Sequence, residues 1–243
     1  MLPGKQWLEA YEKLKPRLAC PSDLSSYFTA GRIAGLEIDR LAIGSVSLPD
    51  GGIIVCDPFF LEDEDEPFFQ YGPAGEFPVT LAVIKPVRDG CARYAAARVL
   101  FSDEEAVRYS LALSGSEDFE DFEDGDFFGF GVETGLACIC DTKTRAAFAA
   151  FREEWYREHG EEESLCDDYF EKLFAENARL NPRYQRAGGG WLNWQIPDTE
   201  YHIPFFASGF GEGCYPSYFG YAAGGSICSL VIQMIDIELA SNE

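Results

Sequence analysis

The stretch from Leu41 to Cys56, LAIGSVSLPDGGIIVC, sets the expected architecture. It opens with an alternation of large apolar side chains with small or polar ones, as in a strand that buries one face. Pro49-Asp50-Gly51-Gly52 is typical of a turn, and the apolar run Ile53–Cys56 follows it. The pattern therefore predicts a β-hairpin within residues 36–55, and with it an antiparallel sheet.

Further strand-like segments follow along the chain, each a short run rich in apolar and aromatic residues and bounded by turn residues. They are residues 79–84, 94–101, 128–132, 136–140, 201–207, 215–221 and 226–237. Asp89-Gly90 is the turn expected between the first two of these strands. So many short strands indicate that the core is built on sheet.

Helices are predicted where apolar residues recur at helical spacing between start and stop signals. One covers about residues 5–15, and a short one is expected after Ser102, where Glu105 completes a capping box. The longest covers residues 142–159, and another covers about 164–177.

The last two predicted helices form a helical insertion over about residues 142–178, and the glycine-rich residues 181–194 are expected to be a loop. No internal repeat and no linker divides the chain. The prediction is a single α+β domain over residues 1–243. Its centre is a mainly antiparallel sheet, either sandwich-like or one curved sheet, flanked by two or three helices.

The chain is strongly acidic, with 42 Asp and Glu against 19 Lys and Arg and a net charge of −23. The charge is concentrated in three blocks, Glu62–Glu66, Glu117–Asp126 and Glu161–Glu163. Such a surface repels nucleic-acid phosphates and anionic membranes and attracts basic proteins. Nucleic acids and membranes are therefore not expected as partners, and a basic protein is.

Composition also bears on compartment and cofactors. There is no apolar run of about 18 residues and no secretory signal, so a cytoplasmic protein is expected. The eight cysteines are scattered through apolar stretches, which favours buried free thiols over a disulfide framework. With only His159 and His202 available, no zinc site and no cofactor are predicted.

The second acidic block has aromatic residues between its acids, EDFEDFEDGDFF over residues 117–128. One interpretation is a solvated loop that raises solubility. The other is a docking surface, in which Phe119, Phe122, Phe127 and Phe128 are apolar anchors inside a negative field, as at fast and tight heteromeric interfaces. Its predicted binding residues are Glu117, Asp118, Phe119, Glu120, Asp121, Phe122, Glu123 and Asp124.

The stretch SGFGEGCYPSYFG over residues 208–220 is the strongest local signal in the chain. Alternating glycines give the backbone access to positive φ or to close contacts. The functional interpretation is a loop that presents Glu212 to a pocket lined by Phe210, Tyr215 and Tyr218. The structural alternative is a bulge or hairpin that needs glycine for steric reasons alone.

Several acids lie at predicted strand or turn edges, namely Asp57, Glu76, Glu133, Asp141 and Glu212. If they converge, they can act as a general acid/base pair or bind a divalent cation. Glu76, Glu133, Asp141 and Glu212 are therefore the catalytic candidates for the alternative hypothesis, a carboxylate- or metal-dependent hydrolase.

Four of these segments occur together and in order: Asp57-Pro58, Pro73–Val79, Val132–Asp141 and Ser208–Gly220. In this the chain resembles a bacterial family known as domain of unknown function 4241. The resemblance implies a bacterial cytoplasmic protein and implies no established chemistry.

The family usually has Asp at two positions where this chain has Glu133 and Glu212. Acidic single-domain proteins of this type are similar to immunity proteins and antitoxins of toxin systems. The leading hypothesis is thus a non-enzymatic binding protein, an immunity protein or antitoxin that occludes a basic toxin domain.

Overall fold

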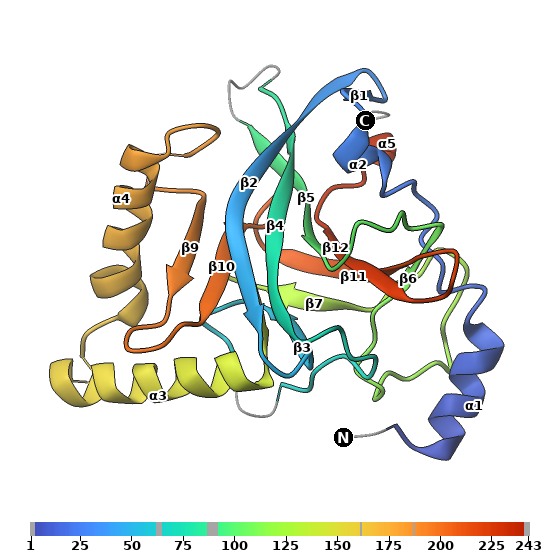
Figure 1. Cartoon of the computed structure of the whole chain (residues 1–243), viewed down its shortest axis with the longest axis horizontal. Helices are drawn as coiled ribbons and strands as arrows, with labels where there is room; N and C mark the ends of the chain where they lie inside the picture. The colour runs from blue at the N-terminus through green and yellow to red at the C-terminus, as the bar shows by residue number, and fades with distance from the viewer. Residues whose placement is uncertain (1–2, 62–64, 87–91, 161, 187, 241–243) are drawn as a thin grey trace.

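The computed structural model of the chain describes residues 3–61, 65–86, 92–160, 162–186 and 188–240. Part of the first acidic block, Glu161 of the third and the predicted Asp89-Gly90 turn lie outside these residues. The described chain forms two antiparallel sheets with helices on their outer faces (Figure 1). This confirms the predicted α+β class with a mainly antiparallel sheet.

The larger sheet has eight strands and curls strongly across its width (Figure 1). Its strand order is β1 (Arg32–Ile33), β2 (Leu36–Leu48), β4 (Gly75–Ile84), β5 (Arg93–Leu100), β12 (Ile227–Gln233), β11 (Gly213–Tyr221) and β6 (Arg108–Leu111). The remaining strand, β7 (Gly129–Val132), pairs with the first half of β11.

The smaller sheet has the order β3 (Ile53–Cys56), β8 (Leu136–Asp141), β10 (His202–Ala207) and β9 (Trp191–Gln195). The predicted hairpin is wrong, because β2 pairs with β4 whereas β3 pairs with β8. The turn after β2 carries the chain from one sheet to the other. The physical reason is that β3 is apolar on both faces, and only a position between two cores buries both.

Three buried clusters follow from this arrangement. The first lies between the two sheets and takes Ile53 and Val55 from β3. The second covers the other face of the larger sheet, under the N-terminal helices. The third lies between the smaller sheet and the later helices and takes Ile54 and Cys56. Alternate residues of one strand therefore serve two cores.

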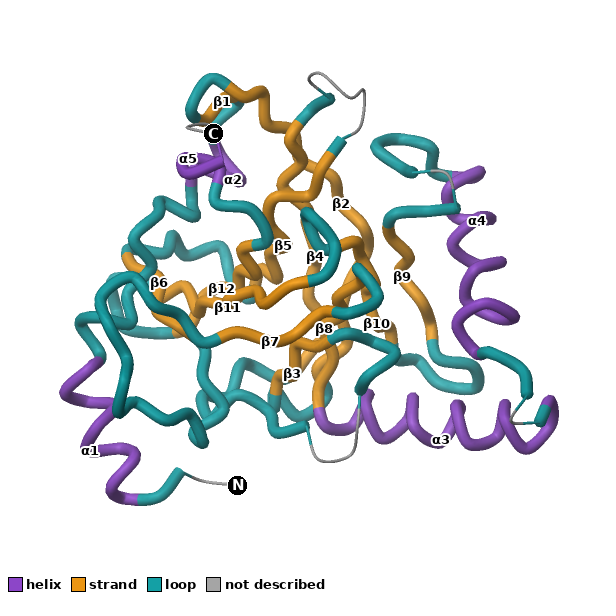
Figure 2. Tube along the Cα trace, turned by 180° about the vertical axis from the view of Figure 1, so that it is seen from behind, coloured by secondary structure: helices purple, strands orange, loops and turns teal. Residues whose placement is uncertain are grey.

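The helices lie at the periphery (Figures 1 and 2). They are α1 (Lys5–Leu14), α2 (Ser26–Thr29), α3 (Thr142–His159), α4 (Glu171–Leu180) and α5 (Ile237–Ala240), with a π-helical segment, Leu165–Phe170, leading into α4. Helix α3 begins at Asp141, whose carboxylate accepts hydrogen bonds from the backbone N–H groups of Lys143 and Thr144. None of the described helices has both the length and the apolarity to cross a membrane.

Three local predictions are wrong. The segment after Ser102 is not a helix but leads into strand β6. Tyr109 and Leu111, two residues apart on this strand, both point into the second cluster, and the backbone of β6 pairs with β11. The predicted loop 181–194 contains most of β9, and the last predicted strand ends at Gln233, four residues before α5 begins at Ile237. Pairing with distant strands overrides local preference in the first two cases.

Candidate functional site: an acidic-rimmed groove beside β11

The acidic segment 117–128 directs three of its four aromatic rings, Phe119, Phe122 and Phe128, into the second cluster. Phe122 is buried and stacks on Phe128 with ring centroids 5.1 Å apart, and Phe119 packs on Trp7 of α1 at 5.2 Å. The hypothesis that Phe119 and Phe122 project outward as anchors therefore needs correction. Both rings join the second cluster because burial against α1 and the sheet removes their apolar surface from water.

The backbone of the segment is tied to the body of the protein at both ends. Glu117 accepts hydrogen bonds from the backbone N–H groups of Ser114 (2.5 Å) and Gly115 (3.0 Å). Arg17 donates to the carboxylate of Asp124 at 2.5 Å and to the carbonyl of Phe122 at 2.9 Å. The segment is thus held in one conformation by its rings and by these bonds.

The remaining carboxylates of the segment face solvent. Asp118, Glu120, Asp121, Glu123, Asp124 and Asp126 are all exposed, whereas Glu117 is half-buried. Two of them also shape the backbone: Asp118 accepts from the N–H of Glu120 at 2.9 Å, and Asp126 accepts from the N–H of Glu123 at 2.8 Å. The segment therefore presents a fixed array of negative charges.

The glycine-rich stretch before β11 forms a tight turn closed by its own side chains. The hydroxyl of Tyr215 contacts the carbonyl oxygens of Ser208 (2.9 Å) and Gly211 (2.8 Å), and Ser208 Oγ donates to Gly211 O at 2.7 Å. Gly209 has φ +52°, and a Cβ there would lie 2.9 Å from the carbonyl of Met234. Steric need therefore accounts for the glycine at this position.

A groove of about 460 Å³ brings the two predicted segments together. One wall is Asp124–Phe127 of the acidic segment, and the other is formed by residues of β11, including Tyr215 and Tyr218. The loop before α2 and the end of β12 complete it, through Arg17, Ala19, Pro21, Gln233, Met234 and Asp236. Asp124, Tyr215 and Tyr218 were singled out by the sequence.

Two other predicted residues of the glycine-rich stretch point elsewhere. The ring of Phe210 is 65% exposed and lies 5.3 Å from the guanidinium carbon of Arg93. Glu212 is exposed and is not part of the groove lining. The predicted pocket thus contains Tyr215 and Tyr218 but neither Phe210 nor Glu212.

The groove combines an apolar interior with charged edges. Leu111, Met234 and Pro216 line it, and at its margin Phe127 is 46% and Leu239 is 69% exposed. Asp124, Asp126 and Asp236 supply negative charge, and Arg17 is the cation among its described lining residues. Exposed apolar residues next to acids are typical of a surface that binds a partly apolar, cationic group.

The chemistry of the groove favours binding over nucleophilic attack. Burial raises the pKa of Tyr218 well above its usual value and raises the pKa of Tyr215. Burial likewise raises the pKa of Cys214, so its thiol is protonated at neutral pH. These groups are hydrogen-bond donors and apolar surface rather than activated nucleophiles.

The acidic segment also borders two further hollows. One, of about 600 Å³, lies between α1 and the start of the segment and is lined by Trp7, Lys13 and Phe119 among others. The other, of about 360 Å³, is lined by Phe122 and Asp126 among others. The charged segment is therefore a ridge between concave surfaces, which gives a partner several places to interlock.

The predicted catalytic acids lie in separate places. Glu76 is exposed on β4 and accepts a hydrogen bond from Ser45 of β2. Asp141 is fully buried at the start of α3, where it also accepts from the N–H of Asp50 at 2.8 Å, and burial raises its pKa to about 6. Neither acid is among the described residues that line the groove.

Glu133 and Glu212 are the two candidates that the fold brings together. They flank the paired residues Val132 and Gly213 on β7 and β11, and both are exposed. Among the described residues, no group of three or more His, Cys, Asp or Glu side chains has an arrangement suited to a metal ion.

Asp57 has a structural role that the sequence alone did not reveal. It is 2% exposed, and its carboxylate accepts from the N–H groups of Glu133 (3.0 Å), Thr134 (2.8 Å) and Phe59 (3.1 Å). The hydroxyl of Thr134 adds a bond of 2.8 Å. One buried carboxylate thus ties the end of β3 to the turn between β7 and β8, and the Asp-Pro pair after an apolar run was its only sequence signal.

The same turn contacts the glycine-rich stretch, because Ser208 N donates to Gly135 O at 3.0 Å. Three of the four motif segments therefore meet at one place, next to the wall of the groove formed by β11.

Comparison with known proteins gives one result. Searches of curated proteins and of solved structures found no match. A family model, described as "Protein of unknown function (DUF4241)", matches residues 46–232. This span includes the acidic segment and nearly all of the larger sheet from β4 onward. The chain belongs to this family of unknown function, DUF4241.

Proposed function

We propose that this chain is a non-catalytic binding protein whose acidic-rimmed groove receives a basic protein partner. The class that fits best is a bacterial immunity protein or antitoxin, which blocks a toxin domain by covering it. The main support for the proposal is that the charged ridge, residues 117–128, borders an apolar groove. Residues from distant parts of the chain line this groove.

Charge and shape have different roles in this mechanism. A net charge of −23 accelerates the encounter with a basic partner, and the effect acts over about 8 Å at physiological salt. The groove then takes an apolar side chain flanked by Lys or Arg residues of the partner. Burying one such side chain contributes about 1.5–3 kcal/mol, so contacts on the ridge must add to it.

The apolar contact is expected at Phe127 and Leu239. Phe119, Phe122 and Phe128 stabilise the ridge from inside, whereas Phe127, the fourth predicted anchor, is exposed together with Leu239. The rigid ridge also favours affinity, because little side-chain or backbone freedom is lost on binding.

The alternative hypothesis, a carboxylate- or metal-dependent hydrolase, draws less support from the geometry. It requires Glu76, Glu133, Asp141 and Glu212 to act on one substrate. Only Glu133 and Glu212 are neighbours, and Asp141 is occupied as a helix cap.

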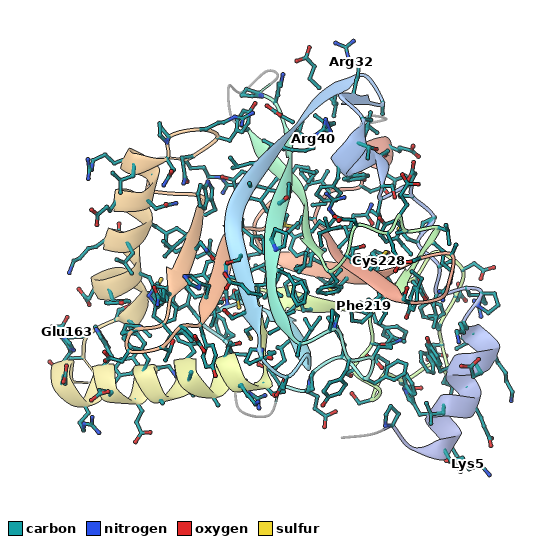
Figure 3. All side chains as sticks on the ribbon, in the orientation of Figure 1. Lys5, Arg32, Arg40, Glu163, Phe219 and Cys228 are labelled. Carbon is teal, nitrogen blue, oxygen red and sulfur yellow. The ribbon has the colours of Figure 1, made fainter. Side chains whose placement is uncertain are left out.

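The test is affinity capture from lysate of the source organism at low and high salt, with two matched variants. The ridge variant carries Asp118→Asn, Glu120→Gln, Asp121→Asn and Glu123→Gln, which are exposed positions. The control variant carries Glu→Gln at 153, 158, 162 and 163, exposed positions on or just after α3, on the side of the molecule away from α1 (Figure 3).

Both variants change the net charge equally, so a difference between them reports position rather than total charge. The proposal expects a stoichiometric basic protein that the wild type and the control retain and the ridge variant loses. Equal retention by both variants, or loss from both, would show that the ridge is not the interface.

A further inference from the structure

Two arginines on the larger sheet carry no counter-ion, in a chain that has more than two acids for every base. Arg40 lies on β2 and Arg98 lies on β5. No ion pair joins either guanidinium to a carboxylate within the described residues. By contrast, the exposed basic residues Arg32 and Lys85 each pair with an acid, Glu37.

Both arginines are on the same face of the sheet. Alternation along β2 puts Arg40 on the face of Ile38, and alternation along β5 puts Arg98 on the face of Ala96; both neighbours belong to the second cluster. Strand β4 separates β2 from β5, where Arg40 pairs with Ala82 and Arg98 pairs with Thr80, two residues along β4. Two strand spacings and this offset put the two Cα positions about 12 Å apart. Two arginine side chains easily span such a gap.

The surroundings of Arg98 orient its guanidinium but leave its N–H donors without hydrogen-bond acceptors among the described residues. The guanidinium carbon lies 4.4 Å from the ring centroid of Phe28, so the group stacks on α2 and its in-plane donors point past the ring. Its Nε is buried and has no hydrogen-bond partner. Burial lowers the pKa of Arg98, and the charge of Arg40 acts in the same direction.

Arg40 lies on the same face as Arg98, and its guanidinium also makes few hydrogen bonds. Its Nη1 donates to the carbonyl of Ala30 at 3.4 Å, a long bond (Figure 3 shows Arg40 beside α2). The nearest acid in sequence, Asp39, is on the opposite face and is bound by Arg183 (2.5 Å) and Tyr184 (2.6 Å). Each guanidinium carries five N–H donors, so most of the donors here have no acceptor among the described residues.

We propose that Arg40 and Arg98 form a binding site for a phosphate-type oxyanion, either free phosphate or the phosphate group of a small metabolite. A tetrahedral dianion matches the paired forks of two guanidinium groups and neutralises their mutual repulsion. Thr80, which pairs with Arg98 across β4 and β5, adds a hydroxyl on the same face. The strongly negative surface disfavours weak, non-specific anion binding, so occupancy here depends on this local geometry.

The test measures thermal unfolding of the full chain in sodium phosphate at pH 7.5, against sodium chloride of equal ionic strength. The wild type should gain a phosphate-dependent rise in Tm that chloride does not give. Arg98→Gln should weaken phosphate binding about tenfold or more, and Arg98→Lys should also weaken it, because Lys keeps the charge and loses the fork. Arg32→Gln, which removes an exposed arginine near the same end of β2, is the control and should leave the rise unchanged.

A second variant keeps the test decisive if Arg98→Gln fails to fold. Arg40→Gln should fold, since it gives up one long hydrogen bond, and should also weaken phosphate binding about tenfold. Glycerol 3-phosphate in place of phosphate distinguishes the two sources: tighter binding indicates a phosphorylated metabolite, and weaker binding indicates free phosphate. An equal rise in wild type and Arg40→Gln, or no rise beyond chloride in the wild type, would overturn the proposal.

Discussion

Replacing Asp57 by Asn should destabilise the protein by about 3–5 kcal/mol. The substitution keeps the size of the side chain but exchanges one acceptor oxygen for an NH₂ group, which then faces backbone N–H donors. In one orientation the bonds from Glu133 and Thr134 at 3.0 and 2.8 Å are lost, and in the other the bond from Phe59 at 3.1 Å is lost. Hydrogen bonds to charged groups contribute about 1.5–3 kcal/mol each, and buried donors left unpaired cost more.

The assay is urea denaturation followed by tryptophan fluorescence, comparing free energies of unfolding extrapolated to water. Glu133→Gln is the matched control, because it neutralises an exposed carboxylate on the same turn and should change stability by less than about 0.5 kcal/mol. The reasoning is refuted if Asp57→Asn unfolds within about 1 kcal/mol of the wild type. A result of that size would mean that the carboxylate does not hold the turn, and a chemical role for Asp57 would have to be considered.

Two further predictions concern Asp141 and Tyr215. The folded pKa of Asp141, about 6, lies above the ordinary value of 3.8, so the folded state binds more protons and loses stability as pH rises from about 4 to 7. Asp141→Asn keeps a good helix cap and removes this titration. Between pH 4 and 7 the free energy of unfolding of the wild type should therefore fall by about 2–3 kcal/mol relative to that of the variant. Parallel pH profiles of the two proteins would contradict this. Tyr215→Phe should cost about 1–2 kcal/mol by calorimetry, because its hydroxyl closes the turn at Ser208 and Gly211; an unchanged Tm would show that the glycines alone set the turn.

Local patterns predicted the elements whose residues carry their own signals. Helix α3 covers Thr142–His159, the limits that the sequence predicted, and Gly160 lies just past its end. The strands of residues 79–84 and 215–221 also lie where alternation and turn residues indicated. These features depend on neighbours within a few positions, so a single sequence contains them.

Predictions failed where a distant partner decides the outcome. The local pattern of Ile53–Cys56 fits both a hairpin strand and a strand of a second sheet. Only the pairing of this run with β8, more than eighty positions away, shows that it belongs to the second sheet. The segment after Ser102 carried a helix start signal, yet residues 108–111 form strand β6 because they hydrogen-bond to the backbone of β11. Phe119 and Phe122 looked like exposed anchors because the sequence does not show that α1 covers them.

Composition and local, ordered motifs are enough to establish the net charge of −23, its concentration next to aromatic residues, the α+β class and the family. Which of these features act together depends on tertiary packing. Arg17, Asp124, Tyr215 and Asp236 share one groove, and Arg40 and Arg98 lie on the same face of the larger sheet, although each set is scattered along the chain. Such contacts form when long loops close and pack against two buried faces. The free energy that stabilises them depends on the whole packed core rather than on any local stretch.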